Sequence, residues 1–184
     1  MKHYPVYLYL AGKPVLLVGG GAVAWQKLPP LLACGARVRV VSPRALPQIR
    51  RLAQDGKIVW SVRSYREADT QGQCLVIGAT DDARLQKKIA RDARAHGIWV
   101  NVVDVPPLCD FIAPAVISRG DLQLAISTGG AAPALAKHLR ENLEQLLNLG
   151  YDDFVKTAKK MRPAILKLPK AKRMSIWKKL IYGH

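Results

Sequence analysis

The chain has 184 residues, 49% of them hydrophobic, and its 29 Lys and Arg against 13 Asp and Glu give a net charge of +16. This size and apolar content indicate a folded protein with one good core. No apolar run approaches the ~20 residues of a membrane span, and the N-terminus lacks the apolar stretch of a signal peptide, so we expect a cytoplasmic protein. The chain has three cysteines, Cys34, Cys74 and Cys109, whose spacing fits neither a disulfide framework nor a zinc site. We expect all three to be small, buried apolar residues.

Strand-like and helix-like segments alternate through the first two thirds of the chain. Expected strands cover residues 15–18, 38–41, 58–62, 74–79 and 98–103, and expected helices cover 22–33, 46–54 and 82–96. Alternation at these lengths predicts an α/β fold, a Rossmann-like doubly wound parallel sheet with right-handed crossovers. Pro29 and Pro30 lie inside the first helix, where each removes a hydrogen-bond donor, so we expect a kink or an early end there.

Three glycines stand where the first strand ends and the first helix should begin, in the segment KPVLLVGGGAVA. Backbone N–H groups at a helix N-terminus, together with the positive end of the helix dipole, bind a pyrophosphate well. The spacing of Gly19, Gly21 and Ala24 matches the dinucleotide fingerprint: a tight turn, close phosphate approach and helix–strand packing. The alternative is a glycine-rich turn without a ligand.

The second strand ends in Ser42, Pro43 and Arg44, where dinucleotide-binding folds carry an acidic residue for the ribose. No carboxylate stands here. Ser42 can bond a ribose hydroxyl, whereas Arg44 suits a 2′-phosphate, so these residues alone leave NAD and NADP both open.

Polar residues also follow two later strands at the same expected sheet edge. Thr80 is a candidate cofactor contact, and Asp81 or Asp82 is expected to cap the next helix. Asp104 closes an apolar strand before two prolines; if partly buried, it would act as a general base through a raised pKa, or as a metal ligand when ionised. An ordinary turn-forming Asp is the alternative, and Asp110, more easily explained as a loop residue, is the competing carboxylate.

The pattern changes after residue 107. Two short strands (115–118 and 122–127) precede a helix expected to run to about Leu149. A hairpin with one helix cannot bury its own apolar face, which favours pairing with a second copy. The turn from Ser127 to Gly130 offers hydroxyls and backbone N–H groups for substrate carboxylates, or simply caps the following helix.

The last 34 residues carry ten Lys and Arg against two Asp, half of the net charge. We expect two short basic helices there, separated by Pro163 and Pro169. Such a surface attracts polyanions: nucleic acid, an anionic membrane or a small substrate with many carboxylates. A solvated tail that promotes solubility is the alternative.

Five motifs, in this order, resemble the precorrin-2 dehydrogenase family, siroheme-pathway enzymes also found as the N-terminal half of siroheme synthase. They are KPVLLVGGGAVA, RVRVVSPR, CLVIGATDD, NVVDVPPLCDFIAPA and LQLAISTGGAAPALAKHLRE, and the match runs from Tyr4 to Leu147. The resemblance implies NAD-dependent oxidation of precorrin-2, an octacarboxylate tetrapyrrole, to sirohydrochlorin. Some family members also act as a ferrochelatase and insert Fe²⁺ as a substrate, and family members are homodimers.

The resemblance also implies roles for individual residues. It makes Asp104 the base in dehydrogenation, implicated in chelation too, and it places Ser127, with Gly129, near the tetrapyrrole. The family commonly lacks the acidic ribose residue, which favours NAD. The expected cofactor-binding residues are Gly19, Gly21, Ala22, Val23, Ser42, Pro43, Thr80 and Asn101, and no resident metal is expected.

The expected organisation is an NAD-binding domain (1–113), a small α+β dimerisation region (114–149) and a basic helical module (150–184). The expected partners are the tetrapyrrole and a second copy, with neither nucleic acid nor membrane. The alternative function is an NAD(H)-sensing regulatory module whose basic tail binds nucleic acid. It would show a winged or helix-turn-helix unit, which we do not find, and it would have no need of Asp104.

Overall fold

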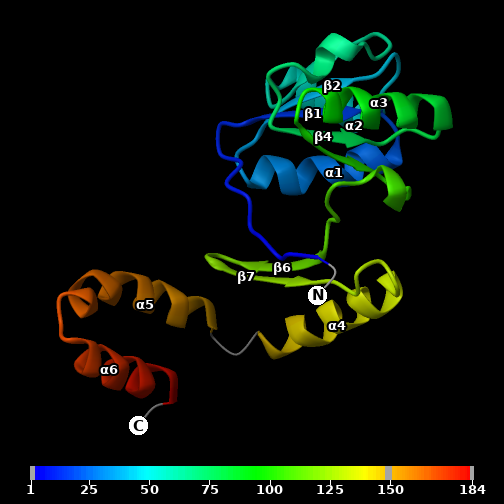
Figure 1. Ribbon diagram of the computed structural model, residues 1–184. Helices are drawn as coiled ribbons and strands as arrows, with labels where there is room; N and C mark the ends of the chain where they lie inside the picture. Colours follow the sequence, from blue (N-terminus) through cyan, green and yellow to red (C-terminus); the bar gives the residue numbers. More distant parts are fainter. Residues whose placement is uncertain (1–2, 148–150, 183–184) are drawn as a thin grey trace. The chain divides into compact units, whose positions relative to one another are not determined.

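The computed structural model describes residues 3–147 and 151–182, and the chain divides into two compact units, Met1–Ala113 and Pro114–His184 (Figure 1). The first unit contains five strands, three helices and two 3₁₀ turns. In chain order they are β1 (Pro14–Val18), α1 (Ala22–Ala33), β2 (Arg37–Val41), α2 (Pro47–Gln54), β3 (Val59–Ser61), η1 (Glu67–Thr70), β4 (Leu75–Gly78), α3 (Ala83–Ala95), β5 (Trp99–Val102) and η2 (Pro106–Leu108).

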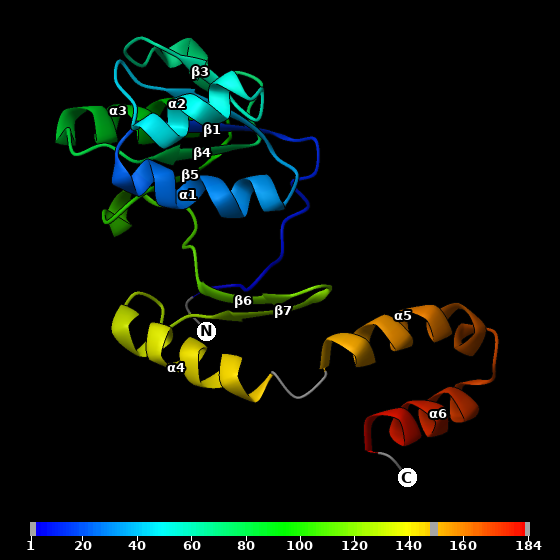
Figure 2. The same cartoon turned by 180° about the vertical axis from the view of Figure 1, so that it is seen from behind.

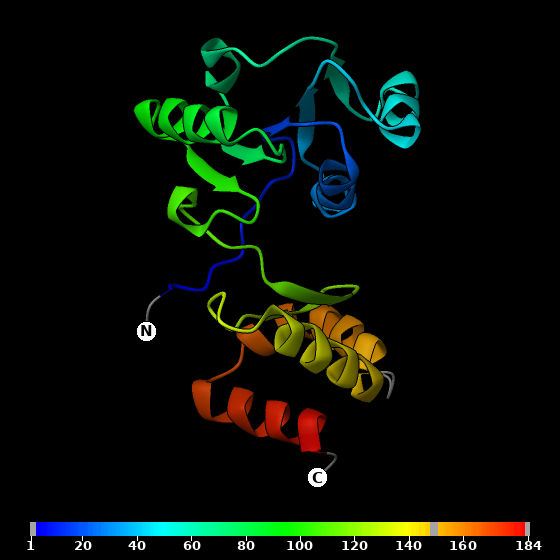
Figure 3. The same cartoon turned by 90° about the vertical axis from the view of Figure 1, so that its right-hand side faces the viewer.

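The five strands form one parallel sheet in the order β3-β2-β1-β4-β5. In the register, Val15 of β1 lies between Val38 of β2 and Leu75 of β4. Helices α1 and α2 cover one face of the sheet and α3 covers the other, as Figures 2 and 3 show. The predicted doubly wound α/β fold is therefore confirmed.

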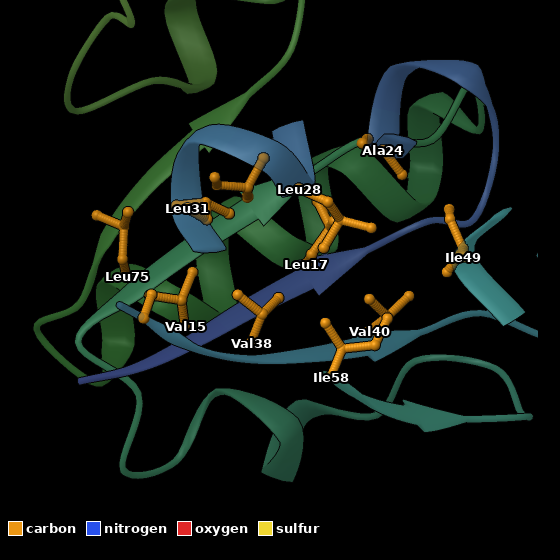
Figure 4. Packing of buried hydrophobic residues seen from close by; sticks show 13 residues of the cluster. Val15, Leu17, Ala24, Leu28, Leu31, Val38, Val40, Ile49, Ile58 and Leu75 are labelled. Carbon is orange, nitrogen blue, oxygen red and sulfur yellow. The ribbon is translucent and has the colours of Figure 1, made fainter. Parts of the chain in front are cut away.

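Strands β1 and β4 are apolar throughout because both of their faces are buried. Leu17 packs beneath Leu28 and Leu31 of α1 on one face (Figure 4), whereas its neighbour Leu16 packs with Ile89 of α3 on the other. Successive strand side chains point to opposite faces, so one short run contributes to two hydrophobic layers.

Of the two outcomes expected at Pro29 and Pro30, a kink or an early end, the early end is wrong: helix α1 continues to Ala33. Both prolines are exposed, so the carbonyl groups that lose an N–H partner lie on the solvent side of the helix. The opposite side keeps the helix in place through buried Leu28 and Leu31, and the helix ends where the Cys34 N–H donates to the Pro30 carbonyl at 3.1 Å.

The expectation of buried cysteines is wrong for two of the three. Cys34 and Cys74 are exposed, and Cys109 is half-buried. Cys34 lies in the turn after α1, and Cys74 directly precedes the buried residues of β4, so each stands just outside the core.

The second unit begins with an antiparallel hairpin of β6 (Ala115–Arg119) and β7 (Leu122–Ile126), on which α4 (Pro133–Leu146) packs. Ile117 of β6 and Ala136 of α4 are both buried. The predicted end of this helix, at Leu149, lies outside the described residues.

Two further helices follow, α5 (Tyr151–Leu166) and α6 (Lys170–Tyr182). The predicted break at Pro163 is wrong, because this proline lies in the last turn of α5. Ile165, in the same turn, is buried. The chain breaks only around Pro169. Lys159 of α5 pairs with Asp121, in the turn of the hairpin, at 2.6 Å. None of the helices in the described ranges is long and apolar enough to cross a membrane.

A buried carboxylate on α3 ties this helix to the segment between β3 and η1. Asp92 accepts hydrogen bonds from the Tyr65 hydroxyl at 3.2 Å, from Lys88 at 2.7 Å and from Arg91 at 2.9 Å. Burial alone would raise the pKa of Asp92, but the bonds from Lys88 and Arg91 outweigh it, so the pKa lies below its ordinary value. The carboxylate is therefore charged, and it stabilises the fold at neutral pH.

We expect Asp92→Ala to lower the free energy of unfolding by about 2 kcal/mol at pH 7, because the Tyr65 hydroxyl and two cations lose their acceptor. The folded-state pKa lies below the unfolded value of about 3.9, so this stabilisation is present above that pH and is lost as pH falls through the folded-state pKa. Urea denaturation across a pH series measures the difference, with exposed Asp55→Ala as control. A difference that stays constant down to pH 2 would contradict the assignment.

Candidate functional site

A cleft of about 1040 Å³ runs along the carboxyl ends of the parallel strands. It lies where the strand order reverses between β1 and β4, the position at which open parallel sheets bind ligands. Loops following all five strands contribute to it. The lining includes residues 19–23, 42–47, 64–65, 80–82 and 103–105.

The turn after β1 fits between the ends of the two neighbouring strands. Gly19 has a φ of 123°, and a Cβ there would lie 2.0 Å from the Ala79 carbonyl oxygen. A Cβ on Gly20 would lie 2.2 Å from the carbonyl oxygen of Arg44. Glycine is therefore required at both positions. The fingerprint pointed to Gly19; Gly20 was missed, although it stands in the same run.

Gly21 differs, because a Cβ there would meet no atom within 4 Å and would extend into open space. Gly21 is the N-cap of helix α1, which begins at Ala22 without a capping side chain and without an acidic residue in its first turn. Its neighbour α3, which starts at the same sheet edge, is capped by Asp82. Ala22 and Val23, at the N-terminus of α1, line the cleft. Their backbone N–H groups can bind an anion that occupies the open space beside Gly21.

The loop after β2 is fixed by its own serine. Buried Ser42 donates from its hydroxyl to the Arg44 carbonyl at 2.5 Å, and its carbonyl accepts from the Trp60 indole at 3.0 Å. Pro43 and Arg44 are exposed at the cleft. This end of the cleft therefore presents the Arg44 cation and the apolar ring of Pro43, with no carboxylate in the loop.

The loop after β4 confirms the predicted cap. Asp82 accepts from the backbone N–H groups of Arg84 at 2.9 Å and Leu85 at 3.1 Å. Thr80 lines the cleft, and its hydroxyl accepts from the Asp82 N–H at 3.3 Å. Asp81 is exposed at the same rim.

Asp104 lines the cleft at the end of β5. Its φ of 63° is the only positive value among the non-glycine residues that the structure describes. The expected partial burial is wrong, because Asp104 is exposed: the turn closed by the Val105 N–H and the Val102 carbonyl, at 3.1 Å, carries it beyond the buried part of the strand. Asp110, the competing carboxylate, is instead structural, since it pairs with Arg94 at 2.9 Å.

The structure does not bring Asn101 to the cleft, because it is buried in β5 and its carboxamide donates to the Phe111 carbonyl at 2.8 Å. Ser64 and Tyr65 line the cleft without having been predicted. They belong to the segment between β3 and β4, whose sequence carries no periodic pattern or motif that marks it.

Ser127 and Gly129 lie in the second unit, in the turn between β7 and α4. Both are exposed, and the Ser127 hydroxyl accepts from the Gly129 N–H at 3.1 Å. Their binding of substrate stays a prediction. Across residues 3–147 and 151–182, no group of three or more His, Cys, Asp or Glu could hold a metal ion.

A doubly wound sheet with an uncapped, glycine-led helix N-terminus at its switch point defines a dinucleotide-binding protein. Residues 6–115 match the family model described as putative NAD(P)-binding, and the chain belongs to this family. Residues 119–146 match the model of the sirohaem biosynthesis protein central region.

The most informative relatives are siroheme synthases. That of Methylococcus capsulatus is 40% identical over 186 residues, and siroheme synthase 1 of Aeromonas salmonicida is 46% identical over 147 residues. These alignments cover 100% and 80% of this chain but only 39% and 31% of the relatives, so the chain spans about two fifths of their length or less. A solved structure titled "SirC, precorrin-2 dehydrogenase" matches with a TM-score of 0.80 and 29% identity, covering 97% of this chain and 89% of that one. The resemblance drawn from the motifs is confirmed.

The glycine turn yields a paired prediction. Gly19→Ala should lower the free energy of unfolding by about 3 kcal/mol, because its Cβ would overlap a backbone carbonyl. Gly21→Asp should leave the melting temperature nearly unchanged but abolish NAD binding. Its carboxylate would occupy the space of the pyrophosphate and repel the negative charge of that group. Thermal denaturation and isothermal titration with NAD separate the two effects. Unchanged NAD affinity in Gly21→Asp would exclude this site.

Proposed function

We propose that the chain is an NAD-dependent precorrin-2 dehydrogenase, which oxidises precorrin-2 to sirohydrochlorin in siroheme biosynthesis. The observation that carries the proposal is the exposed carboxylate of Asp104 on the rim of the same cleft as the anion-binding turn. The names of the similar siroheme synthases and of the similar solved structure support the same reaction.

The reaction removes one hydride and one proton from the tetrapyrrole. NAD, when bound, accepts the hydride. The backbone N–H groups at Ala22 and Val23 would hold its pyrophosphate, and the loop of Ser42 and Pro43 would lie against the adenosine end, because that loop follows β2. The Asp104 carboxylate would take the proton as general base, since it extends from the end of β5 into the cleft.

The charge of the chain agrees with this substrate. A protein with a net charge of +16 attracts an octacarboxylate over long range and raises its local concentration. In the second unit, the Ser127 hydroxyl accepts from the Gly129 N–H and keeps its own proton to donate to a substrate carboxylate, and the resemblance places this turn near the tetrapyrrole.

Insertion of Fe²⁺, as substrate, is a further activity that the resemblance attaches to Asp104, and we propose it as a second step on the same rim. Adding Fe²⁺ after dehydrogenation is complete tests it by the appearance of siroheme absorption. We do not propose the regulatory alternative, because the relatives matched over this chain carry the names of enzymes.

We also propose that the chain forms a homodimer through its second unit. Leu135, Leu139 and Leu146 lie on one face of α4 at helical spacing, and each is at least 39% exposed. The outer face of the hairpin adds exposed Val116. A two-stranded hairpin with one helix is marginal alone, and a second copy would cover these side chains.

The central test mixes the purified chain with NAD and precorrin-2 and follows sirohydrochlorin absorption. Asp104→Asn should lower kcat at least about a hundredfold, because a general base contributes 10²–10⁴ and Asn still tolerates a positive φ. The dissociation constant for NAD should stay within about twofold. Asp81→Asn, which removes another exposed carboxylate from the same cleft, is the matched control. Near-normal turnover by Asp104→Asn would remove its assigned role.

Sedimentation equilibrium tests the dimer. The unaltered chain should sediment at twice the mass of one chain, and Leu139→Glu should shift it to the monomer by placing a charge in the apolar contact. Lys137→Glu, on the opposite face of α4, is the control and should remain dimeric. A monomeric unaltered chain would refute the proposal.

A further inference from the structure

The loop that carries Asp104 is closed on itself by one cysteine. Cys109, five residues further along, donates from its Sγ to the Val102 carbonyl at 3.0 Å and lies 3.4 Å from the Val105 carbonyl. The Val102 carbonyl also accepts from the Val105 N–H at 3.1 Å. The thiol thus contacts the backbone on both sides of Asp104.

Cys109 suits this role chemically. It is half-buried, and burial raises the pKa of its thiol, so the sulfur keeps the proton that it donates. The neighbouring residues are fixed in turn. Asp110 accepts from the Val100 N–H at 3.1 Å, and the Asn101 carboxamide lies 3.6 Å from the Cys109 sulfur while donating to the Phe111 carbonyl.

A positive φ at a non-glycine residue is disfavoured and persists only where the surroundings impose it. Asp104 is exposed, so packing of its own side chain does not impose its conformation. The positive φ is therefore imposed by hydrogen bonds to the backbone on either side of Asp104. We propose that Cys109 is a positioning residue: its thiol holds the turn that presents the Asp104 carboxylate to the cleft. This inference rests on the proposed function, and it concerns a residue that does not itself touch the reacting atoms.

The test compares Cys109→Ala, which removes the donor, with Cys109→Ser, which keeps one. Cys34→Ala, at an exposed cysteine of the same unit, controls for loss of a thiol. In Cys109→Ala, kcat for precorrin-2 should fall about tenfold to a hundredfold, because a misplacement of about 1 Å costs this much. KM and the NAD dissociation constant should stay within about twofold. Cys109→Ser should recover most of the activity.

Amide hydrogen exchange gives a readout independent of turnover. In Cys109→Ala the turn should loosen, and exchange of the Val105 N–H should become at least tenfold faster. In Cys109→Ser exchange should be slow again. Both results are independent of the substrate of the chain. An unaltered chain that binds NAD but leaves precorrin-2 unoxidised would refute the proposed function, and the exchange data would still decide the positioning role. Normal kcat together with unchanged Val105 exchange in Cys109→Ala would overturn the inference.

Discussion

The close approach of β1 and β4 at Gly19 is the constraint on which the cleft depends. With no room for a side chain beside the Ala79 carbonyl, the chain leaves β1 between its neighbours and turns at once into α1. The Gly19 N–H donates to the Val41 carbonyl at 3.0 Å, so the same turn is also bonded to β2. The helix N-terminus consequently faces the gap at the switch point, where its unpaired N–H groups become a binding site.

Four carboxylates of the first unit, Asp69, Asp82, Asp92 and Asp104, serve two different purposes. Asp69 accepts two bonds from Arg63, at 2.6 and 2.8 Å, and Asp92 has three side-chain donors, so both hold loops in place. Asp82 caps a helix. Asp104 is exposed at the cleft, in a strained backbone conformation. The carboxylate oxygens of Asp104 can therefore accept hydrogen bonds from a ligand. Those of Asp69, Asp82 and Asp92 already accept hydrogen bonds from the protein.

Sequence reasoning succeeds here where a local pattern has one physical meaning. The apolar runs of β1 and β4 can only be buried strands once glycines end them, and Asp82 stands where a cap belongs. It fails where distant residues decide the outcome. Pro29 remains helical because the opposite helix face packs on the sheet, and Tyr65 reaches the cleft because Asp92, far along the chain, fixes its hydroxyl. The exposure of Asp104 likewise depends on a turn that the Val105 N–H closes on the Val102 carbonyl, and Cys109 donates to the same carbonyl.

The two ends of the cleft therefore differ in how closely sequence determines function. At the end formed by the glycine turn, the proposed coenzyme contacts are backbone N–H groups. Ala22 and Val23 share these groups with any residue except proline, so a glycine pattern is only a weak identifier. At the other end the proposed function requires one side chain to be presented, and it assigns specific chemistry to two residues: a carboxylate to Asp104 and a thiol donor to Cys109. The motif that joins these residues is more specific than the fingerprint because it encodes a particular hydrogen-bonded loop, whereas the fingerprint encodes only the absence of side chains.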